Sequence, residues 1–260
     1  MRRVFKIHLS VVLLFALPCA AQAVETVYVK VLVDDEEPAV TAHWQQRLRR
    51  RVEAASAILS QYGRMRVAVL QFERWESTDG VTDFGATLTE FEQNVKPDPA
   101  HLAIGFSSQH RFGAGRHRVG GIRGPLSSHI LIRESAPHVL EKERLEVLVH
   151  ELGHYFGAAH SDQRTSVMRP TLGDGQARAA AFRIGFDAEN GAIVRIVAGE
   201  INTFRVRRFT DISADGRRNL IAQYERLARR MPDDPTAARY IQVLRSTSVP
   251  LPRRSPGQLP

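Results

Sequence analysis

Two histidines and a glutamate stand close together in the run H-E-L-G-H at positions 150–154. His150 and His154 are four residues apart, so on a helix they project from the same face about one turn apart. Two imidazoles at that separation can bind one Zn²⁺ ion. In a chain of this composition the pattern H-E-x-x-H is expected by chance only about 0.02 times. The alternative is a helix that uses these histidines only for packing.

A third histidine follows the pair after a glycine, because the pattern continues through Gly157 to His160. A ligand further along the same straight helix would reach the metal poorly. Gly157 can adopt the left-handed conformation that ends a helix, so the chain can turn and bring His160 back from another direction. Three protein ligands leave the fourth position of Zn²⁺ open, which is the arrangement of a catalytic site and not of a structural site.

Glu151 lies one residue after His150, about 100° further around a helix. A carboxylate at this position can reach a water on the metal, but it cannot easily share the metal with both histidines. Zinc lowers the pKa of such a water from about 15.7 toward about 7. Glu151 could therefore take a proton as the zinc-activated water attacks a carbonyl, and then deliver it to the leaving amine. Without a metal, Glu151 would be a solvated carboxylate on the helix surface.

The extended motif H-E-x-x-H-x-x-G-x-x-H, followed by Met168, resembles the metzincin clan of zinc endopeptidases. The resemblance implies that one catalytic zinc ion is bound by His150, His154 and His160, with Glu151 as the general base. It also implies that Met168 lies beneath the metal as a packing floor and not as a ligand. Methionine is a common core filler, and that is the alternative for Met168.

Features around the motif point to two branches of the clan. Ser161 and the run from Met168 to Pro170 look like the matrixin branch, whereas a short helix from Leu88 looks more like the reprolysin branch. In some branches a tyrosine assists the oxyanion at the position that Pro170 occupies here. That tyrosine therefore has no counterpart at position 170.

The resemblance also implies where a substrate would lie. Five glycines fall between positions 113 and 124, and an edge strand near 119–123 would bind an extended substrate by adding a strand. A plain flexible loop is equally consistent with this glycine content. The substrate-binding residues that we expect on this edge are Gly120, Gly121 and Ile122. We also expect Pro170, Thr171 and Leu172 to border the pocket for the substrate residue that follows the cleaved bond.

The rest of the chain predicts the elements that must position these residues. Runs of β-branched and apolar residues predict strands over 26–33, 67–72, 101–106 and 128–133. Apolar residues at three- and four-residue steps predict helices over 38–59, 88–95 and 141–156. This order resembles a metzincin catalytic domain. It implies an α/β fold with a twisted, mostly parallel sheet, an antiparallel edge strand and a long active-site helix.

A helical pattern returns at 188–204, although Asn190-Gly191 could instead form a hairpin turn. We expect residues 24–206 to form the catalytic domain. Helices around 220–230 and 237–244 then predict a small helical appendage over 207–247 that packs on this domain. The tail 248–260 contains four prolines and is predicted to be disordered.

Residues 1–23 have the features of a cleaved signal peptide. The basic residues Arg2, Arg3 and Lys6 precede an apolar stretch over 9–17 that is too short to span a bilayer, and Ala-Gln-Ala ends at position 23. An uncleaved anchor and a twin-arginine signal are the alternatives. Pro18 before Cys19 argues against a lipid anchor. We expect a periplasmic or secreted protein with no stable membrane anchor after cleavage.

The composition, with 43% hydrophobic and 25% charged residues, is that of a soluble globular protein and excludes collagen-like, low-complexity and disulfide-framework classes. The net charge is +8, and an arginine run over 47–51 is interpreted as a solvated helix face. No aromatic residues interleave with it, so no nucleic-acid partner is expected. No calcium or second-zinc motif is visible. The remaining histidines show no ligand spacing, and most are expected in loops or on the surface (His43, His101, His110, His117, His129 and His138).

The sequence therefore predicts an exported, zinc-dependent endopeptidase that acts on a protein or peptide substrate, and its oligomeric state stays open. A catalytically degenerate protein that binds zinc and peptides without cutting them is the first alternative. A non-enzymatic adhesion or envelope protein that uses its basic surface is the second.

Overall fold

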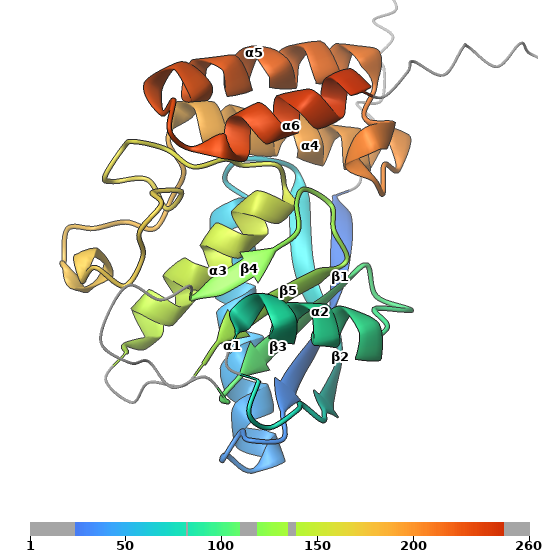
Figure 1. Cartoon of the computed structure of the whole chain (residues 1–260), viewed down its shortest axis with the longest axis vertical. Helices are drawn as coiled ribbons and strands as arrows, with labels where there is room; N and C mark the ends of the chain where they lie inside the picture. The colour runs from blue at the N-terminus through green and yellow to red at the C-terminus, as the bar shows by residue number, and fades with distance from the viewer. Residues whose placement is uncertain (1–23, 82, 110–118, 135–138, 247–260) are drawn as a thin grey trace, which may run out of the picture.

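The computed structural model describes residues 24–81, 83–109, 119–134 and 139–246. The predicted signal peptide, the predicted disordered tail and part of the glycine-rich segment lie outside the described residues, as do His110, His117 and His138. One sheet has the strand order β2-β1-β3-β5-β4. Its strands are β1 (Glu25–Asp34), β2 (Met65–Trp75), β3 (Leu102–Ser107), β4 (Gly120–Ile122) and β5 (His129–Arg133) (Figure 1).

Four of the strands run parallel, and β4 alone runs antiparallel, beside β5. Parallel strands buried on both faces are nearly continuous in apolar residues, as β1 and β3 are here. The predicted α/β class, with a mostly parallel sheet and an antiparallel edge strand, is confirmed.

Helices cover both faces of this sheet. On one face α1 (Thr41–Leu59) and α3 (Glu141–Tyr155) share the main core with alternate residues of β1, whereas α2 (Phe84–Asn94) packs in a second cluster with Leu32 of β1. The sequence predicted that the first helix begins at Pro38, but in the structure it begins at Thr41. Val40 is still extended there, with ψ 149°, so the helix cannot include the residues before it.

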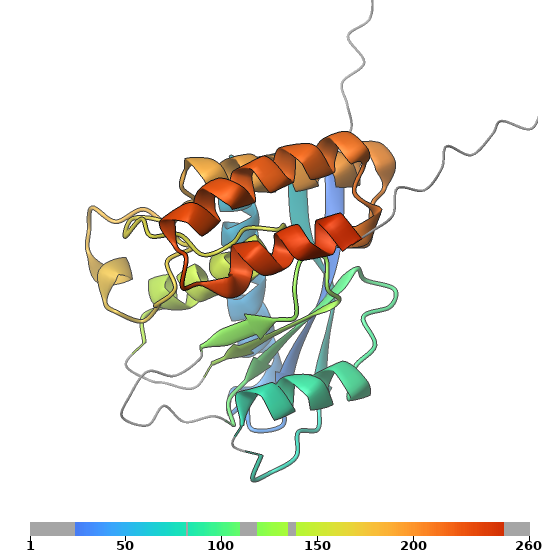
Figure 2. The same ribbon diagram turned by 45° about the horizontal axis from the view of Figure 1, so that its top comes forward.

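Three further helices form a layer at one end of the sheet: α4 (Ala188–Phe204), α5 (Ala214–Arg230) and α6 (Pro235–Ser246) (Figures 1 and 2). Two short 3-10 turns, over Gln176–Arg178 and Phe209–Asp211, lie in the connections. The helical reading of 188–204 is confirmed, and the Asp187 side chain accepts from the backbone amide of Asn190 at 3.0 Å. The next helix starts earlier than predicted because Ser213 caps it, accepting from Gly216 at 3.0 Å.

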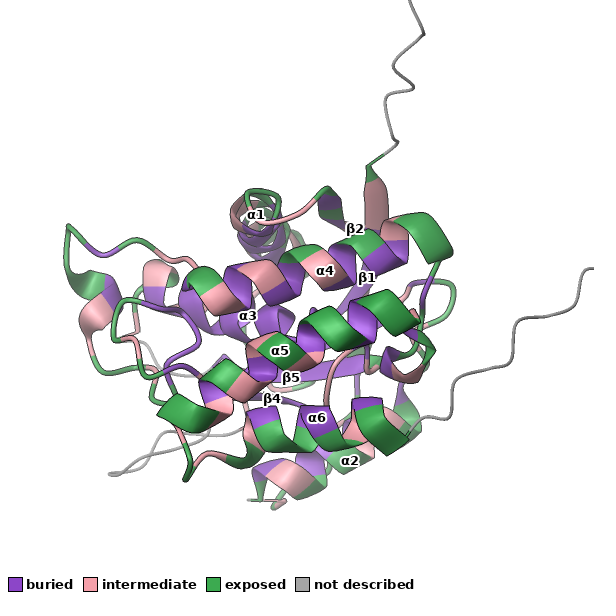
Figure 3. Cartoon of the chain, turned by 90° about the horizontal axis from the view of Figure 1, so that it is seen from above, coloured by how far each residue is buried: buried purple, intermediate pink, exposed green. Residues whose placement is uncertain are grey.

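The predicted packing of the C-terminal helices on the rest of the molecule is confirmed. Leu220, Tyr224 and Leu227 of α5 and Ala237 and Tyr240 of α6 are buried in the main core. Figure 3 shows α4, α5 and α6 side by side, each with buried residues along part of its surface. None of the helices in the described part of the chain combines the length and the apolar character that crossing a membrane requires.

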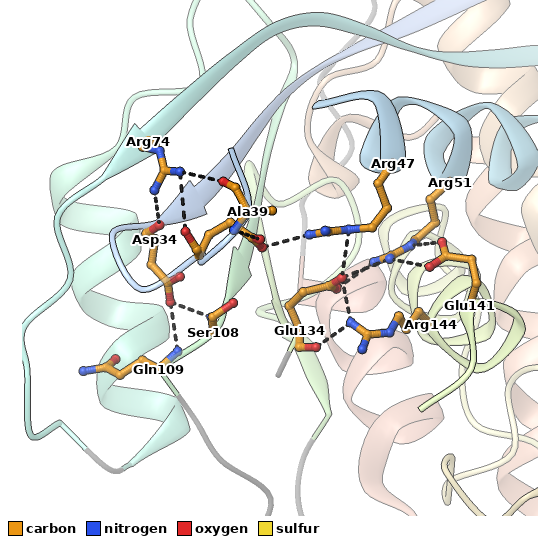
Figure 4. A network of polar contacts seen from close by, with 11 residues as sticks. Asp34, Ala39, Arg47, Arg51, Arg74, Ser108, Gln109, Glu134, Glu141 and Arg144 are labelled. Atoms are coloured by element: carbon orange, nitrogen blue, oxygen red, sulfur yellow. Dashed lines mark hydrogen bonds and ion pairs between the residues drawn. The ribbon is translucent and has the colours of Figure 1, made fainter. Parts of the chain in front are cut away.

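The arginine run on α1 contains one buried member, which corrects the sequence prediction of a solvated face. The Arg51 side chain is 0% exposed, whereas Arg49 and Arg50 are exposed. Arg51 binds the Glu134 carboxylate through two nitrogens, at 2.7 and 3.0 Å, and binds Glu141 at 2.6 and 2.8 Å (Figure 4). Because Glu134 follows β5 and Glu141 begins α3, this ion cluster connects three elements.

Candidate metal centre

The helix α3 presents the two histidines of H-E-x-x-H from one turn of its buried face. Its start is fixed by Glu143, whose carboxylate accepts from the backbone amide of Leu140 at 2.8 Å. The imidazoles of His150 and His154 are buried, with ring centroids 4.6 Å apart. Their Nε2 atoms lie 3.1 Å from each other.

The chain reverses direction directly after this helix, at Gly157. Its φ is +87°, the left-handed conformation that the sequence pattern predicts. The Tyr224 hydroxyl of α5 donates to the Gly157 carbonyl at 2.6 Å, and a Cβ at position 157 would meet this hydroxyl at 3.0 Å. The turn returns His160 to the pair, with ring centroids 5.6 Å from His150 and 5.0 Å from His154. One ligand atom of each histidine lies within 4.8 Å of the others.

The Nδ1 atoms of all three histidines face oxygen acceptors. His150 faces the Val167 carbonyl at 2.8 Å and His154 faces the Ala158 carbonyl at 2.8 Å, whereas His160 faces the Asp234 carboxylate at 2.6 Å. A carbonyl can only accept, so Nδ1 of His150 and His154 carries the proton and Nε2 keeps its lone pair. This is the tautomer in which a metal-binding histidine is held by a neighbouring oxygen.

The residues fit a zinc ion. Two unprotonated Nε2 atoms 3.1 Å apart cannot hydrogen-bond to each other, but they can share a cation. Tetrahedral zinc with bonds of about 2.1 Å separates its nitrogen ligands by about 3.4 Å. Burial lowers the pKa of His150 to about 3, with a further contribution from neighbouring His160, and burial likewise holds the pKa of His154 well below its ordinary value. Both rings are therefore neutral near pH 7, which is the ligating form.

Met168 is buried directly against the active-site helix. A Cβ at Gly153 would meet the Met168 sulfur at 2.7 Å and the Phe186 ring at 2.7 Å, so only glycine permits this approach. The Met168 carbonyl also accepts from the amide of Ser161 at 2.9 Å, next to the third histidine. The structure thus places Met168 under the turn of α3 that carries His154, and its role as a packing floor stays a prediction.

A cleft of about 1000 Å³ opens beside the histidines. Its lining includes the catalytic candidate Glu151 and all six residues predicted to bind substrate (Gly120, Gly121, Ile122, Pro170, Thr171 and Leu172). The edge strand approaches α3 closely, because a Cβ at Gly120 would lie 2.6 Å from the Glu151 carboxylate. The structure brings these residues together, and their roles in binding remain predictions.

The sequence analysis did not identify the contribution of α6 to this site. Thr236, Arg239 and Tyr240 line the cleft, and Asp234 contacts His160 from just before the helix. Asp234 follows His160 by 74 residues, and no motif in the chain connects the two positions.

Two further features contain possible metal ligands, namely His129 alone and a cluster of three carboxylates. His129 is buried on β5 and not at the surface, because its Nε2 contacts the Val95 carbonyl at 2.9 Å and its ring packs against Phe91. Asp35, Glu36 and Asp79 also bring carboxylate oxygens within 4.8 Å of one another. Such acidic groups near the surface are common without an ion, so no metal is assigned to them.

The fold and the three-histidine site define a metzincin-type zinc peptidase domain. The model of the matrixin family matches residues 43–191, which is more than half of the chain. The chain therefore belongs to the matrixin family, and this decides between the two branches that the sequence features suggested. Family and fold together support a zinc metallopeptidase.

The solved structures that match this chain include the following two. The crystal structure of archaemetzincin from Methanopyrus kandleri is 17% identical, with a TM-score of 0.45, over 68% of this chain and 97% of that chain. A structure described as a chaperone-substrate complex is 9% identical, with a TM-score of 0.46, over 70% of this chain and 39% of that chain. No curated protein matches the chain significantly.

Proposed function

We propose that this protein is an exported zinc-dependent endopeptidase with Glu151 as its general base. The observation that carries the proposal is the convergence of three histidines within 4.8 Å of one another in an open cleft, with Glu151 beside them. A closed structural site would need a fourth protein ligand, whereas three ligands leave room for substrate chemistry. We further propose that one zinc ion is bound per chain.

The residues of the cleft can divide the work of peptide hydrolysis. A bound zinc ion supplies an acidified water and polarises the substrate carbonyl. Glu151 is 4% exposed, and its side chain extends from the histidine helix toward Gly120 of the edge strand. Its carboxylate accepts a proton during attack and returns it to the leaving amine. The edge strand β4 ends the described sheet, so an extended peptide can pair with its outer side.

The remaining parts of the proposal rest on sequence. The basic and apolar segments of residues 1–23 support export to the periplasm or the medium. A protein or peptide is the proposed partner, and no nucleic-acid partner is proposed. We also propose residues 24–206 as the catalytic domain and residues 207–247 as a helical appendage.

Metal removal tests this function. The chain purified from Val24 is expected to contain one zinc ion and to cut members of a peptide library. Treatment with 1,10-phenanthroline should abolish cleavage and lower Tm, and added zinc should restore both. At a zinc concentration 1,000 times Kd, the ion stabilises the fold by about 4 kcal/mol.

The outcomes separate the alternatives. One zinc ion with no cleavage of any peptide favours the degenerate protein that binds without cutting. No zinc in the purified chain, and none bound on addition, contradicts the proposal.

A further inference from the structure

The third histidine is held by a side chain from the C-terminal helices. The Asp234 carboxylate lies 2.6 Å from Nδ1 of His160, and the hydroxyl of Thr236 lies 3.4 Å from the same nitrogen. By contrast, His150 and His154 face main-chain carbonyls of nearby residues. His160 is also more exposed than the other two, with 23% of its side chain accessible. Its orientation therefore depends more on this one contact.

Asp234 is itself fixed in place. Its second carboxylate oxygen accepts from the backbone amide of Thr236 at 2.9 Å, and its own amide donates to the Met231 carbonyl at 3.1 Å. Its side chain is only 17% exposed. The helices on either side are anchored in the core through Tyr224 and Tyr240. The carboxylate is therefore presented to His160 by a rigid support.

We propose that Asp234 is a positioning residue of the metal centre and that the helical pair α5–α6 completes it. A carboxylate on the far nitrogen of a ligating histidine fixes the ring orientation and raises the basicity of the nitrogen that binds the metal. Asp234 lies beyond residues 43–191, the part of the chain that the matrixin model matches. The family match therefore does not include this contact. The inference rests on the zinc site proposed above.

The substitution Asp234→Asn tests the role. Asparagine can still accept from the Thr236 amide, but it removes the charge that faces His160. Zinc affinity, measured by competition with a chromogenic chelator, should fall 10- to 100-fold, as for other such partners of ligating histidines. The unfolding midpoint of the metal-free chain should stay close to that of wild type. Asp233→Asn, at the exposed neighbouring position, is the matched control and should change neither quantity.

A second variant separates positioning from folding. In Asp234→Ser the hydroxyl can accept from the Thr236 amide but is too short to reach His160, so it should lose zinc affinity as Asp234→Asn does. Wild-type affinity in either variant overturns the inference. A wild-type chain that binds no zinc would instead contradict the proposed function.

A different observation concerns the substrate. Arg239 of α6 is exposed and lines the cleft. Of the three other arginines in the lining, Arg144 is paired with Glu134 and Arg178 with Glu143, whereas Arg133 packs over the Phe84 ring. Within the described residues no carboxylate forms an ion pair with Arg239, whose guanidinium lies 5.5 Å from the Tyr240 ring centroid.

We infer that Arg239 selects peptides that carry a carboxylate in the segment lying against α6. Guanidinium binds carboxylates through a planar fork, and partial exclusion of water in a cleft strengthens the contact. The carboxylate has two possible sources, an aspartate or glutamate side chain and the C-terminus of the peptide. The inference rests on the proposed peptide binding.

Binding to a chain that does not cut measures this preference directly. In the zinc-loaded Glu151→Gln background, fluorescent peptides with glutamate should bind about 5-fold more tightly than matched peptides with glutamine, the size of a partly exposed ion pair. The added substitution Arg239→Gln should remove the difference, and Arg229→Gln on α5 should not. Peptides with an amidated C-terminus lack the terminal carboxylate, so weaker binding of these peptides would identify the C-terminus as the group that Arg239 binds. Equal binding of all peptides, or a preference that survives Arg239→Gln, overturns the inference. Cleavage of peptides by the wild-type chain tests the proposed peptidase function separately.

Discussion

The substitution Glu151→Gln is expected to lower kcat/KM for peptide cleavage by about 10²- to 10⁴-fold, the contribution of a general base. Glutamine has the same shape and fits the narrow space beside Gly120, where the carboxylate now lies. It cannot accept the proton of an attacking water. Because the three histidines are unchanged, the variant should still contain one zinc ion.

Cleavage rates and metal content measured on the same preparation check this expectation. The control is Glu53→Gln, which removes an exposed carboxylate from α1 and should cut at the wild-type rate. A Glu151→Gln chain that retains more than about a tenth of wild-type kcat/KM would show that another group takes the proton.

The substitution Arg51→Met should cost about 3 kcal/mol of the free energy of unfolding, the typical effect of breaking a buried ion pair. Methionine fills similar space but leaves the Glu134 carboxylate, 4% exposed, without its two-nitrogen partner. Arg144 still contacts Glu134 at 2.7 Å and offsets part of the loss. The exposed neighbour Arg50 provides the control, Arg50→Met, which should change stability by less than about 0.5 kcal/mol.

The same cluster predicts the direction of a pH effect. Burial alone would raise the pKa of Glu134, but Arg51, Arg144 and Arg47 together hold it below its ordinary value. A carboxylate with a lowered pKa stabilises the fold above its unfolded pKa, and this contribution disappears as the pH falls through its folded pKa. The difference in urea midpoint between wild type and Arg51→Met should therefore narrow in acid. A constant difference would contradict the assignment.

Local patterns were sufficient to predict the strands and the motif helix. Runs of valine, isoleucine and leucine indicate β1, β3 and β5, and the spacing of the histidines with Gly157 implies the helix and the turn that the structure contains. Each of these patterns is local, because it is formed by residues that are close together in the sequence. The burial of Arg51 was also detectable in principle, because Arg51 follows Leu48 by three residues and precedes Ala55 by four, on the apolar face of α1.

Tertiary contacts were not predictable in this way. Nothing near Asp234 in the sequence indicates that it contacts His160, because the contact depends on how α5 and α6 pack on the core. The early start of α5 was missed for a different reason. Ser213 caps the helix before its apolar repeat begins at Leu220, so the hydrophobic pattern alone places the start too late.

The hydrogen bond from Tyr224 to Gly157 connects the turn after the histidine helix to a part of the chain that is synthesised later. Synthesis proceeds from the N-terminus, so the histidine helix leaves the ribosome before the tyrosine that stabilises its terminal turn, 67 residues later. Before α5 and α6 dock, a nascent chain contains all three histidines of the centre, but the contacts of Tyr224 and Asp234 are not yet formed. If the proposed zinc site is correct, its full metal affinity is therefore reached only after α5 and α6 have been synthesised and have docked on the core.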